Sequence, residues 1–162
     1  MANYRDNVCG VIRNKEGQLL VCHRTDFAPN EGWQFPQGGI DPEEDLISEL
    51  KRELAEEIGT DAITVCAVAR KRYTYDYPAG MKKKKKGWDG QRQAWVLCEF
   101  IDEMQAINLT VEAKPEFDDW RWVSPLEALA CAVGFKKEVY LAAMTDLKLI
   151  NNASDKNDSE QQ

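Results

Sequence analysis

Four glutamates recur at intervals of one, three and four residues between positions 49 and 57. Glu49, Glu53, Glu56 and Glu57 would share one arc of a helix, with Arg52 at its edge. Like charges four residues apart cost a few tenths of a kcal/mol each, so a solvated helix face usually mixes its signs. Magnesium prefers carboxylates together with substrate phosphates as ligands. The spacing indicates a magnesium site, and the alternative is an acidic exposed face that binds nothing.

The segment around these glutamates has the signals of one amphipathic helix. Asp41 suits the N-cap, Pro42 the first helical position, and Glu44 stands three residues after Asp41, as in a capping box. Gly59 suits the residue just past the C-terminus. We therefore predict a helix from Asp41 to about Gly59. Its apolar stripe, which would pack on a sheet, consists of Leu46, Ile47, Leu50, Leu54 and Ile58.

The rest of the chain alternates strand-like and helix-like segments. Asn14 to Gly17 predicts a hairpin turn between two apolar runs. Ser124 and Pro125 predict the start of a short helix that ends near Ala132. β-branched and aromatic residues predict strands in 62–77, 91–101 and 117–123, and an amphipathic pattern predicts a helix over 135–149. At 162 residues we expect one α/β domain over 1–150 and a disordered polar tail over 151–162.

Composition narrows the kinds of function. No apolar run reaches the roughly 18 residues of a membrane span, and a net charge of −7 disfavours a protein that coats nucleic acid, so we expect neither membrane nor DNA as partner. Five cysteines, four of them in apolar strand-like runs, predict buried free thiols and a cytoplasmic protein. His23 is the single histidine, so a His-rich zinc site is excluded, and we expect a half-exposed strand residue there.

A basic segment interrupts the acidic chain. It comprises residues 70–72, the lysine run 82–86 and Arg92. One interpretation is a collar for a polyphosphate or an RNA 5′ end, and the other is a solvated loop between strands.

The acidic segment also resembles a known family signature. Gly38, Glu44 and the run Arg52 to Gly59 reproduce G-x5-E-x7-R-E-U-x-E-E-x-G-U, the Nudix box, in which U is a bulky apolar residue. Only Thr60 departs from it, at a position where an apolar residue is expected. The resemblance implies a Nudix α/β/α sandwich with a mixed central sheet, the box helix on one side and the C-terminal helix on the other.

The resemblance also implies residue roles. Nudix hydrolases cleave a nucleoside diphosphate linked to another group, with Mg²⁺, or Mn²⁺ in its place, activating water. Glu53, Glu56 and Glu57 match the metal-binding glutamates, and Arg52 matches the arginine that orients a glutamate. Glu116 matches a further carboxylate near the metals, so these five residues form the expected catalytic set. Glu53 is our first candidate for the general base and Glu116 the second.

Motifs outside the box resemble one branch of the family. The segments GWQFPQGGID, TYDYP, GQRQAWVL, EFDDWRWVSP and FKKEVY occur in the order found in bacterial RNA 5′-pyrophosphohydrolases and diadenosine tetraphosphate hydrolases. For Tyr75 and Tyr77 we leave the pocket rim and the core as alternatives, and Phe135 is our candidate for base stacking. The substrate-binding residues that this resemblance implies are Arg5, Gln37, Gly38, Gly39, Tyr75, Tyr77, Gln91, Phe135 and Lys136.

Three functions follow from the resemblance. The first is removal of pyrophosphate from the 5′-triphosphate end of RNA, and the second is hydrolysis of diadenosine tetraphosphate to ATP and AMP. The third is a catalytically silent Nudix domain that senses a nucleotide, which intact Glu53, Glu56 and Glu57 disfavour. The oligomeric state cannot be read from the sequence.

Overall fold

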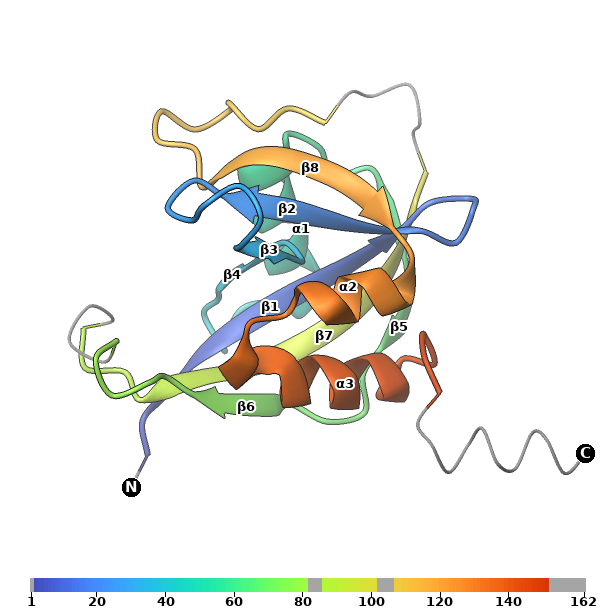
Figure 1. Cartoon of the computed structure of the whole chain (residues 1–162). Helices are drawn as coiled ribbons and strands as arrows, with labels where there is room; N and C mark the ends of the chain where they lie inside the picture. The colour runs from blue at the N-terminus through green and yellow to red at the C-terminus, as the bar shows by residue number, and fades with distance from the viewer. Residues whose placement is uncertain (1, 82–85, 102–106, 152–162) are drawn as a thin grey trace, which may run out of the picture.

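The structure, a computed structural model, describes residues 2–81, 86–101 and 107–151. Most of its strands join one mixed sheet whose two faces are covered by helices (Figure 1). The strands are β1 Tyr4–Arg13, β2 Leu19–Arg24, β3 Trp33–Gln34, β4 Gln37–Gly39, β5 Ile63–Val68, β6 Tyr73–Asp76, β7 Gly90–Phe100 and β8 Phe117–Val123. The helices are α1 Leu46–Ile58, α2 Pro125–Cys131 and α3 Lys137–Asp146, with a 3-10 turn at Gly134–Lys136.

The sheet is opened by the divergence of two sequential strands. β1 and β2 form the predicted hairpin and are in register only where Arg13 faces Leu19. Beyond that point β1 pairs with β7 in parallel and with β4, whereas β2 pairs with β3 and β8. β3 and β4 therefore lie between the two diverging halves of the sheet (Figure 1). This divergence creates the space in which the functional site is built.

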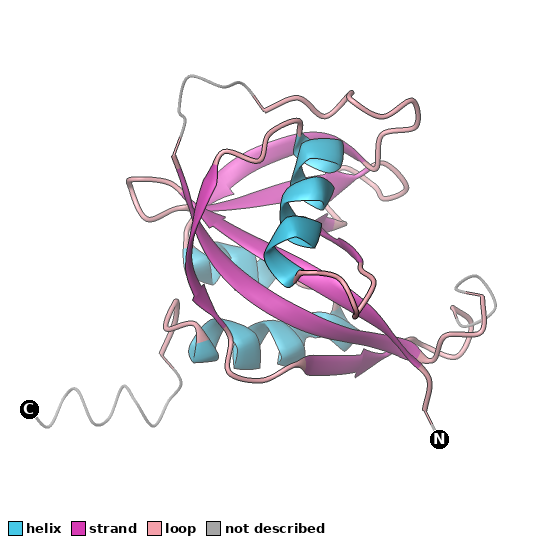
Figure 2. Ribbon diagram, turned by 180° about the vertical axis from the view of Figure 1, so that it is seen from behind, coloured by secondary structure: helices cyan, strands magenta, loops and turns pink. Residues whose placement is uncertain are grey.

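Helix α1 covers one face of the sheet, as the apolar stripe predicted (Figure 2). Leu50, Leu54 and Ile58 are almost completely buried against residues of β1, β2 and β7. At the C-terminus, Gly59 has φ 74°, the left-handed conformation expected of a glycine cap. Thr60 is buried, and its Oγ1 accepts a hydrogen bond from the Ala62 amide at 3.1 Å, so this departure from the Nudix pattern is satisfied locally.

The predicted start of this helix was wrong. α1 begins at Leu46, and its N-cap is Asp45, whose carboxylate accepts hydrogen bonds from the Ser48 amide and hydroxyl. Asp41 instead accepts from the Glu43 amide at 3.0 Å and stabilises a separate turn. Both aspartates have capping chemistry, and the chain uses Asp45 for the helix and Asp41 for the turn that precedes it.

Helices α2 and α3 cover the other face, so the α/β/α arrangement is confirmed (Figure 1). Ser124 and Pro125 start α2 as predicted, with a complete capping box that includes Glu127. The last predicted helix is shorter than expected, because a 3-10 turn precedes α3 and α3 ends at Asp146.

Two residues differ in burial from what the strand patterns predicted. Cys66 is exposed on β5 instead of buried, although Cys9, Cys22 and Cys98 are buried free thiols as expected. His23 is buried instead of half-exposed, with its Nδ1 2.6 Å from Asp118 Oδ1 and its Nε2 2.7 Å from the Ala28 carbonyl oxygen. These partners come from β8 and from the β2–β3 loop, which the local pattern of β2 did not reveal.

Candidate active site

The glutamates of α1 surround one arginine. The Arg52 guanidinium lies 2.8 Å from Glu49, 3.1 Å from Glu53 and 3.2 Å from Glu56. These contacts compensate part of the repulsion between the carboxylates, which the periodicity of the helix places on one arc. Arg52 thus contacts Glu53 and Glu56, two of the three glutamates that the Nudix box singles out.

Glu57 is the most buried of these carboxylates. Its side chain is buried, and its Oε2 atom is enclosed without a hydrogen-bond partner in the described part of the chain. Burial, then the negative charge of Glu116 and then that of Glu53, raise the pKa of Glu57 well above its ordinary value. Burial likewise raises the pKa of Glu53. Three carboxyl groups from α1 and from the segment before β8 therefore face one another in a poorly solvated place.

A divalent cation would fit this arrangement, because a buried carboxylate oxygen without a partner is costly unless a proton or a cation compensates it. In the parts of the chain that the structure describes, no three acidic, histidine or cysteine side chains yet surround one point as a ligand set. Glu53 and Glu56 are instead turned toward Arg52.

Two glycines of β4 leave space for charged side chains to lie against the backbone. A Cβ atom on Gly38 would overlap the Glu53 carboxylate, and a Cβ atom on Gly39 would overlap the Arg5 guanidinium. Gly38 and Gly39 pair with Val8 and Asn7 of β1, which sets their position beside Arg5. Because successive residues of a strand point to opposite faces, the predicted metal ligand Glu53 and the predicted substrate residue Arg5 lie on opposite faces of β4.

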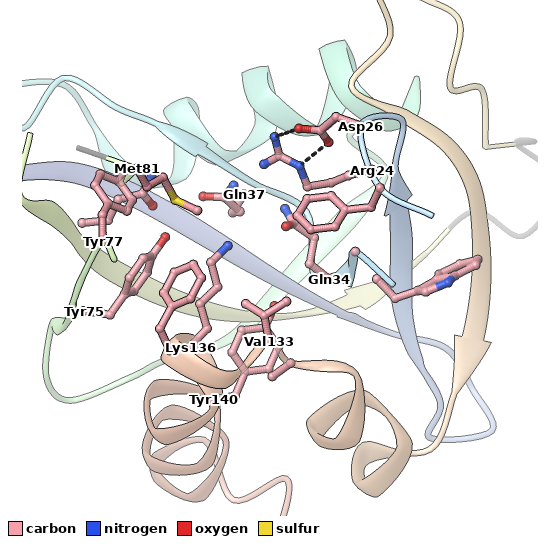
Figure 3. A pocket seen from close by; sticks show the side chains of 16 residues that line it. Arg24, Asp26, Gln34, Gln37, Tyr75, Tyr77, Met81, Val133, Lys136 and Tyr140 are labelled. Carbon is pink, nitrogen blue, oxygen red and sulfur yellow. Dashed lines mark hydrogen bonds and ion pairs between the residues drawn. The ribbon is translucent and has the colours of Figure 1, made fainter. Parts of the chain in front are cut away.

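A cavity of about 500 Å³ lies on the other side of β4, between the diverging strands and α3 (Figure 3). That volume is within the range of small-molecule sites in proteins. Six of the nine predicted substrate residues line it: Gln37, Tyr75, Tyr77, Gln91, Phe135 and Lys136. The wall also includes Arg24, Gln34, Met81 and Tyr140, which sequence reasoning did not select.

Aromatic rings form one side of this cavity. Tyr75 and Tyr77 are 6% and 4% exposed, with ring centroids 5.9 Å apart, so they are core residues that also line the site. The Phe135 ring lies 5.7 Å from that of Tyr75, and Lys136 Nζ lies 5.5 Å from the Tyr75 ring centroid. Figure 3 shows Tyr75, Tyr77 and Lys136 pointing toward the cavity. An aromatic wall with a cation at its edge suits a nucleobase next to a phosphate.

Arg24 connects the cavity to the carboxylates. Its guanidinium binds Asp26 with two hydrogen bonds of 3.0 Å, drawn in Figure 3, and its Nη1 lies 3.9 Å from Glu116 Oε1. Arg24 thus lies between the cavity wall and Glu116, whose negative charge contributes to the raised pKa of Glu57. The only signal in the sequence was the position of Arg24 at the end of a strand, which does not reveal its contact with Glu116 in the segment before β8.

Neither interpretation of the lysine run is tested by the structure, because Lys82 to Lys85 lie outside the described residues. Met81, just before the run, lines the cavity.

A mixed sheet between helices, with a carboxylate-rich helix beside a nucleotide-sized cavity, defines an α/β domain suited to phosphate chemistry. The chain belongs to the NUDIX domain family, whose model matches residues 3–143. It is 39% identical over 140 residues to the RNA pyrophosphohydrolase of Acidiphilium cryptum and 38% identical over 144 residues to that of Caulobacter vibrioides. These matches cover 85% and 87% of this chain and 85% and 84% of the relatives.

A solved structure has the same fold at low sequence identity. The dihydroneopterin triphosphate pyrophosphohydrolase of E. coli superposes with a TM-score of 0.66 at 18% identity, over 85% of this chain and 94% of that one. Members of the NUDIX family generally use divalent metal ions, in agreement with the chemistry of the α1 carboxylates. Among the helices that the structure describes, none has the length and apolarity needed to cross a bilayer.

Proposed function

We propose that this protein removes pyrophosphate from the 5′-triphosphate end of RNA. Water would add to the phosphorus atom nearest the RNA, the bond between that phosphate and the next would break, and a 5′-monophosphate end would remain. The proposal is supported by the relatives named RNA pyrophosphohydrolase, which match this chain over most of both lengths. We expect the protein to be cytoplasmic, where triphosphorylated transcripts occur.

One structural observation carries the proposal: Glu57, which has a buried oxygen without a hydrogen-bond partner among the described residues, lies close to Glu53 and Glu116, and Arg24 links Glu116 to the cavity wall. A site for cations thus adjoins a site for a nucleobase. A triphosphate attached to a nucleoside would span the two.

The proposed metal ligands are Glu53, Glu56, Glu57 and Glu116. Magnesium, or manganese in its place, would neutralise phosphate oxygens and lower the pKa of the attacking water. Glu53 is our candidate for the base that takes the proton of this water, because burial raises its pKa and makes its carboxylate a better proton acceptor. Arg52 orients Glu53 through their 3.1 Å contact.

The remaining residues would bind the substrate. Arg5, whose guanidinium lies over Gly39, would bind a phosphate of the substrate. Phe135 and Tyr75 would stack on a base, and Lys136 would bind the adjoining phosphate. Stacking on the face of a base does not depend on which base it is, so this mode of binding would accept RNA of different sequences.

A comparison of kcat/KM tests this proposal. The protein is incubated with magnesium and either a triphosphorylated RNA oligonucleotide or diadenosine tetraphosphate, and the products are separated. We expect pyrophosphate from the RNA and a kcat/KM at least about tenfold higher for RNA. Glu56→Gln, which alters an exposed side chain, should remove activity without unfolding the protein. A preference for the dinucleotide would overturn the RNA assignment, and activity without added divalent ions would overturn the mechanism.

A further inference from the structure

A chain of buried amides lies beneath the cavity and ends at Gln37. The Trp95 indole Nε1–H donates to Gln93 Oε1 at 3.2 Å, and Gln93 Nε2 donates to Asn7 Oδ1 at 3.0 Å. Asn7 Nδ2 in turn donates to Gln37 Oε1 at 2.5 Å. Trp95, Gln93 and Asn7 are 0%, 4% and 1% exposed, so water does not compete for these bonds.

The strand register explains how residues so far apart in the sequence form one chain. Asn7 of β1 lies beside Gln93 of β7 in a parallel pair, and Cys9 of β1 faces both Trp95 of β7 and Gln37 of β4. Because side chains alternate along a strand, Asn7 shares its face with Cys9, and Gln93 shares its face with Trp95. Both strands therefore point these polar groups toward the cavity side of the sheet.

The chain has a direction, and Trp95 sets it. An indole N–H can donate but cannot accept, so the oxygen of Gln93 must face it. The NH2 group of Gln93 is then left for the Asn7 oxygen, and the NH2 group of Asn7 is left for the Gln37 oxygen. Reversal of any one amide would put two donors or two acceptors face to face in a buried place. The NH2 group of Gln37 is consequently the end that remains for the cavity, which Gln37 lines (Figure 3).

We propose that Asn7, Gln93 and Trp95 are positioning residues that orient the Gln37 amide so that it donates to an oxygen of the bound substrate. The oxygen belongs to the phosphate nearest the nucleoside or to its ribose, because Gln37 precedes Gly38, against which the Glu53 carboxylate lies. Gln37 thus stands where the cavity meets the carboxylates. This inference rests on the proposed function and deepens it, since it assigns donors to the junction between the nucleoside and its phosphates.

A double-mutant cycle between positions 7 and 37 tests the proposal. In Asn7→Asp the new carboxylate accepts from Gln93 and can also accept from Gln37, which turns the Gln37 oxygen toward the substrate. KM should rise about tenfold or more, the factor that a hydrogen bond to a charged group commonly contributes, with kcat within about twofold. Gln37→Met, of similar shape, should raise KM by a similar factor.

The decisive comparison is Asn7→Asp in the Gln37→Met background. No amide remains there to be reversed, so the aspartate should change KM by less than about twofold. An equal loss of activity from Asn7→Asp in both backgrounds would overturn the proposal, because it would show that Asn7 acts by supporting the fold. The control is Asn14→Asp, the same chemical change in an exposed hairpin turn, which should leave KM unchanged.

Thermal unfolding of each variant separates an effect on the fold from an effect on the substrate. Should Asn7→Asp fail to fold, Trp95→Phe takes its place, since it removes the indole donor and retains most of the ring. Its rise in KM should again be confined to the protein that has Gln37, and a rise that is equal in Gln37→Met would overturn the proposal.

The cycle is measured on whichever of the RNA oligonucleotide and diadenosine tetraphosphate the wild-type protein hydrolyses faster. Failure of the RNA assignment would appear in the wild type alone. Failure of the amide orientation would appear only as equal effects in the two backgrounds.

Discussion

The Glu53 carboxylate occupies the space that a side chain at position 38 would need. A Cβ atom on Gly38 would lie within van der Waals overlap of both Glu53 oxygens and of the carbon between them. Neither residue is near the other in the sequence, and β4 and α1 bring them together. The absence of a side chain at Gly38 therefore leaves the space that the Glu53 carboxylate occupies.

Gly38→Ala should displace the Glu53 carboxylate with little effect on stability. The overlapping atoms are the end of a flexible side chain, which can move aside, and the backbone of Gly38 has no positive φ. We expect kcat/KM to fall at least about tenfold and the magnesium concentration for half-maximal rate to rise. Gly80→Ala, where a Cβ meets no atom within 4 Å, is the control. Wild-type kinetics in Gly38→Ala would contradict this role for the glycine.

Glu57→Gln should stabilise the metal-free protein while it abolishes activity. Burial and the neighbouring carboxylates raise the pKa of Glu57 in the folded state above its ordinary value of 4.5. The contribution of Glu57 to the free energy of unfolding is thus fully present below about pH 4.5, where the carboxyl group is protonated in both states. It is lost as the pH rises toward the folded pKa. In EDTA we expect the free energy of unfolding of the variant to exceed that of the wild type by about 1–3 kcal/mol at pH 8. The difference should be smaller at pH 5.

The measurement is urea unfolding of both proteins at the two pH values. Saturating magnesium should reverse the order at pH 8, because only the wild type retains the ligand. A wild type that is the more stable protein in EDTA at pH 8 would refute this prediction.

Leu50→Ala should act on stability alone. Leu50 is 1% exposed and belongs to the apolar cluster between α1 and the sheet. Truncation of a buried leucine costs about 2–5 kcal/mol. Leu126→Ala, at a 69% exposed leucine of α2, should cost little. Chemical denaturation measures both, and a loss below about 1 kcal/mol for Leu50→Ala would mean that α1 does not depend on this contact.

Phe135→Ala should weaken substrate binding. Its ring lies beside Tyr75 on the cavity wall, where stacking on a base is worth about 1–3 kcal/mol. KM for triphosphorylated RNA should rise about five- to 100-fold, with a smaller change in kcat. Leu141→Ala, at an exposed apolar residue of α3, is the control. An unchanged KM would place the base elsewhere.

Local patterns predicted the elements of this fold well, and α1 shows both their strength and their limit. The apolar stripe from Leu46 to Ile58 follows from the helical period and is buried as expected. The helix start was missed because Asp41 and Asp45 both have capping chemistry, and the chain uses one for a turn and the other for the helix. A choice between two competent caps depends on the path of the loop, which local sequence does not specify.

The site was predictable where the residues share one helix or one motif. The carboxylates of α1 and six cavity residues were selected in advance. Arg24 was not selected, because its contact with Glu116 depends on the pairing of β2 with β8. The amide chain through Asn7 was missed for the same reason, since it depends on the parallel register of β1 with β7. Cross-strand partners of this kind are set by tertiary structure.

The most direct test of the account is a crystal structure of the protein with Mn²⁺ and a nonhydrolysable nucleoside triphosphate analogue, with anomalous data for the metal. We expect anomalous peaks within reach of Glu53, Glu56 and Glu57, with phosphate oxygens completing the coordination and the base in the cavity beside Phe135. A bound analogue with no anomalous peak near Glu53, Glu56 or Glu57 would contradict the account.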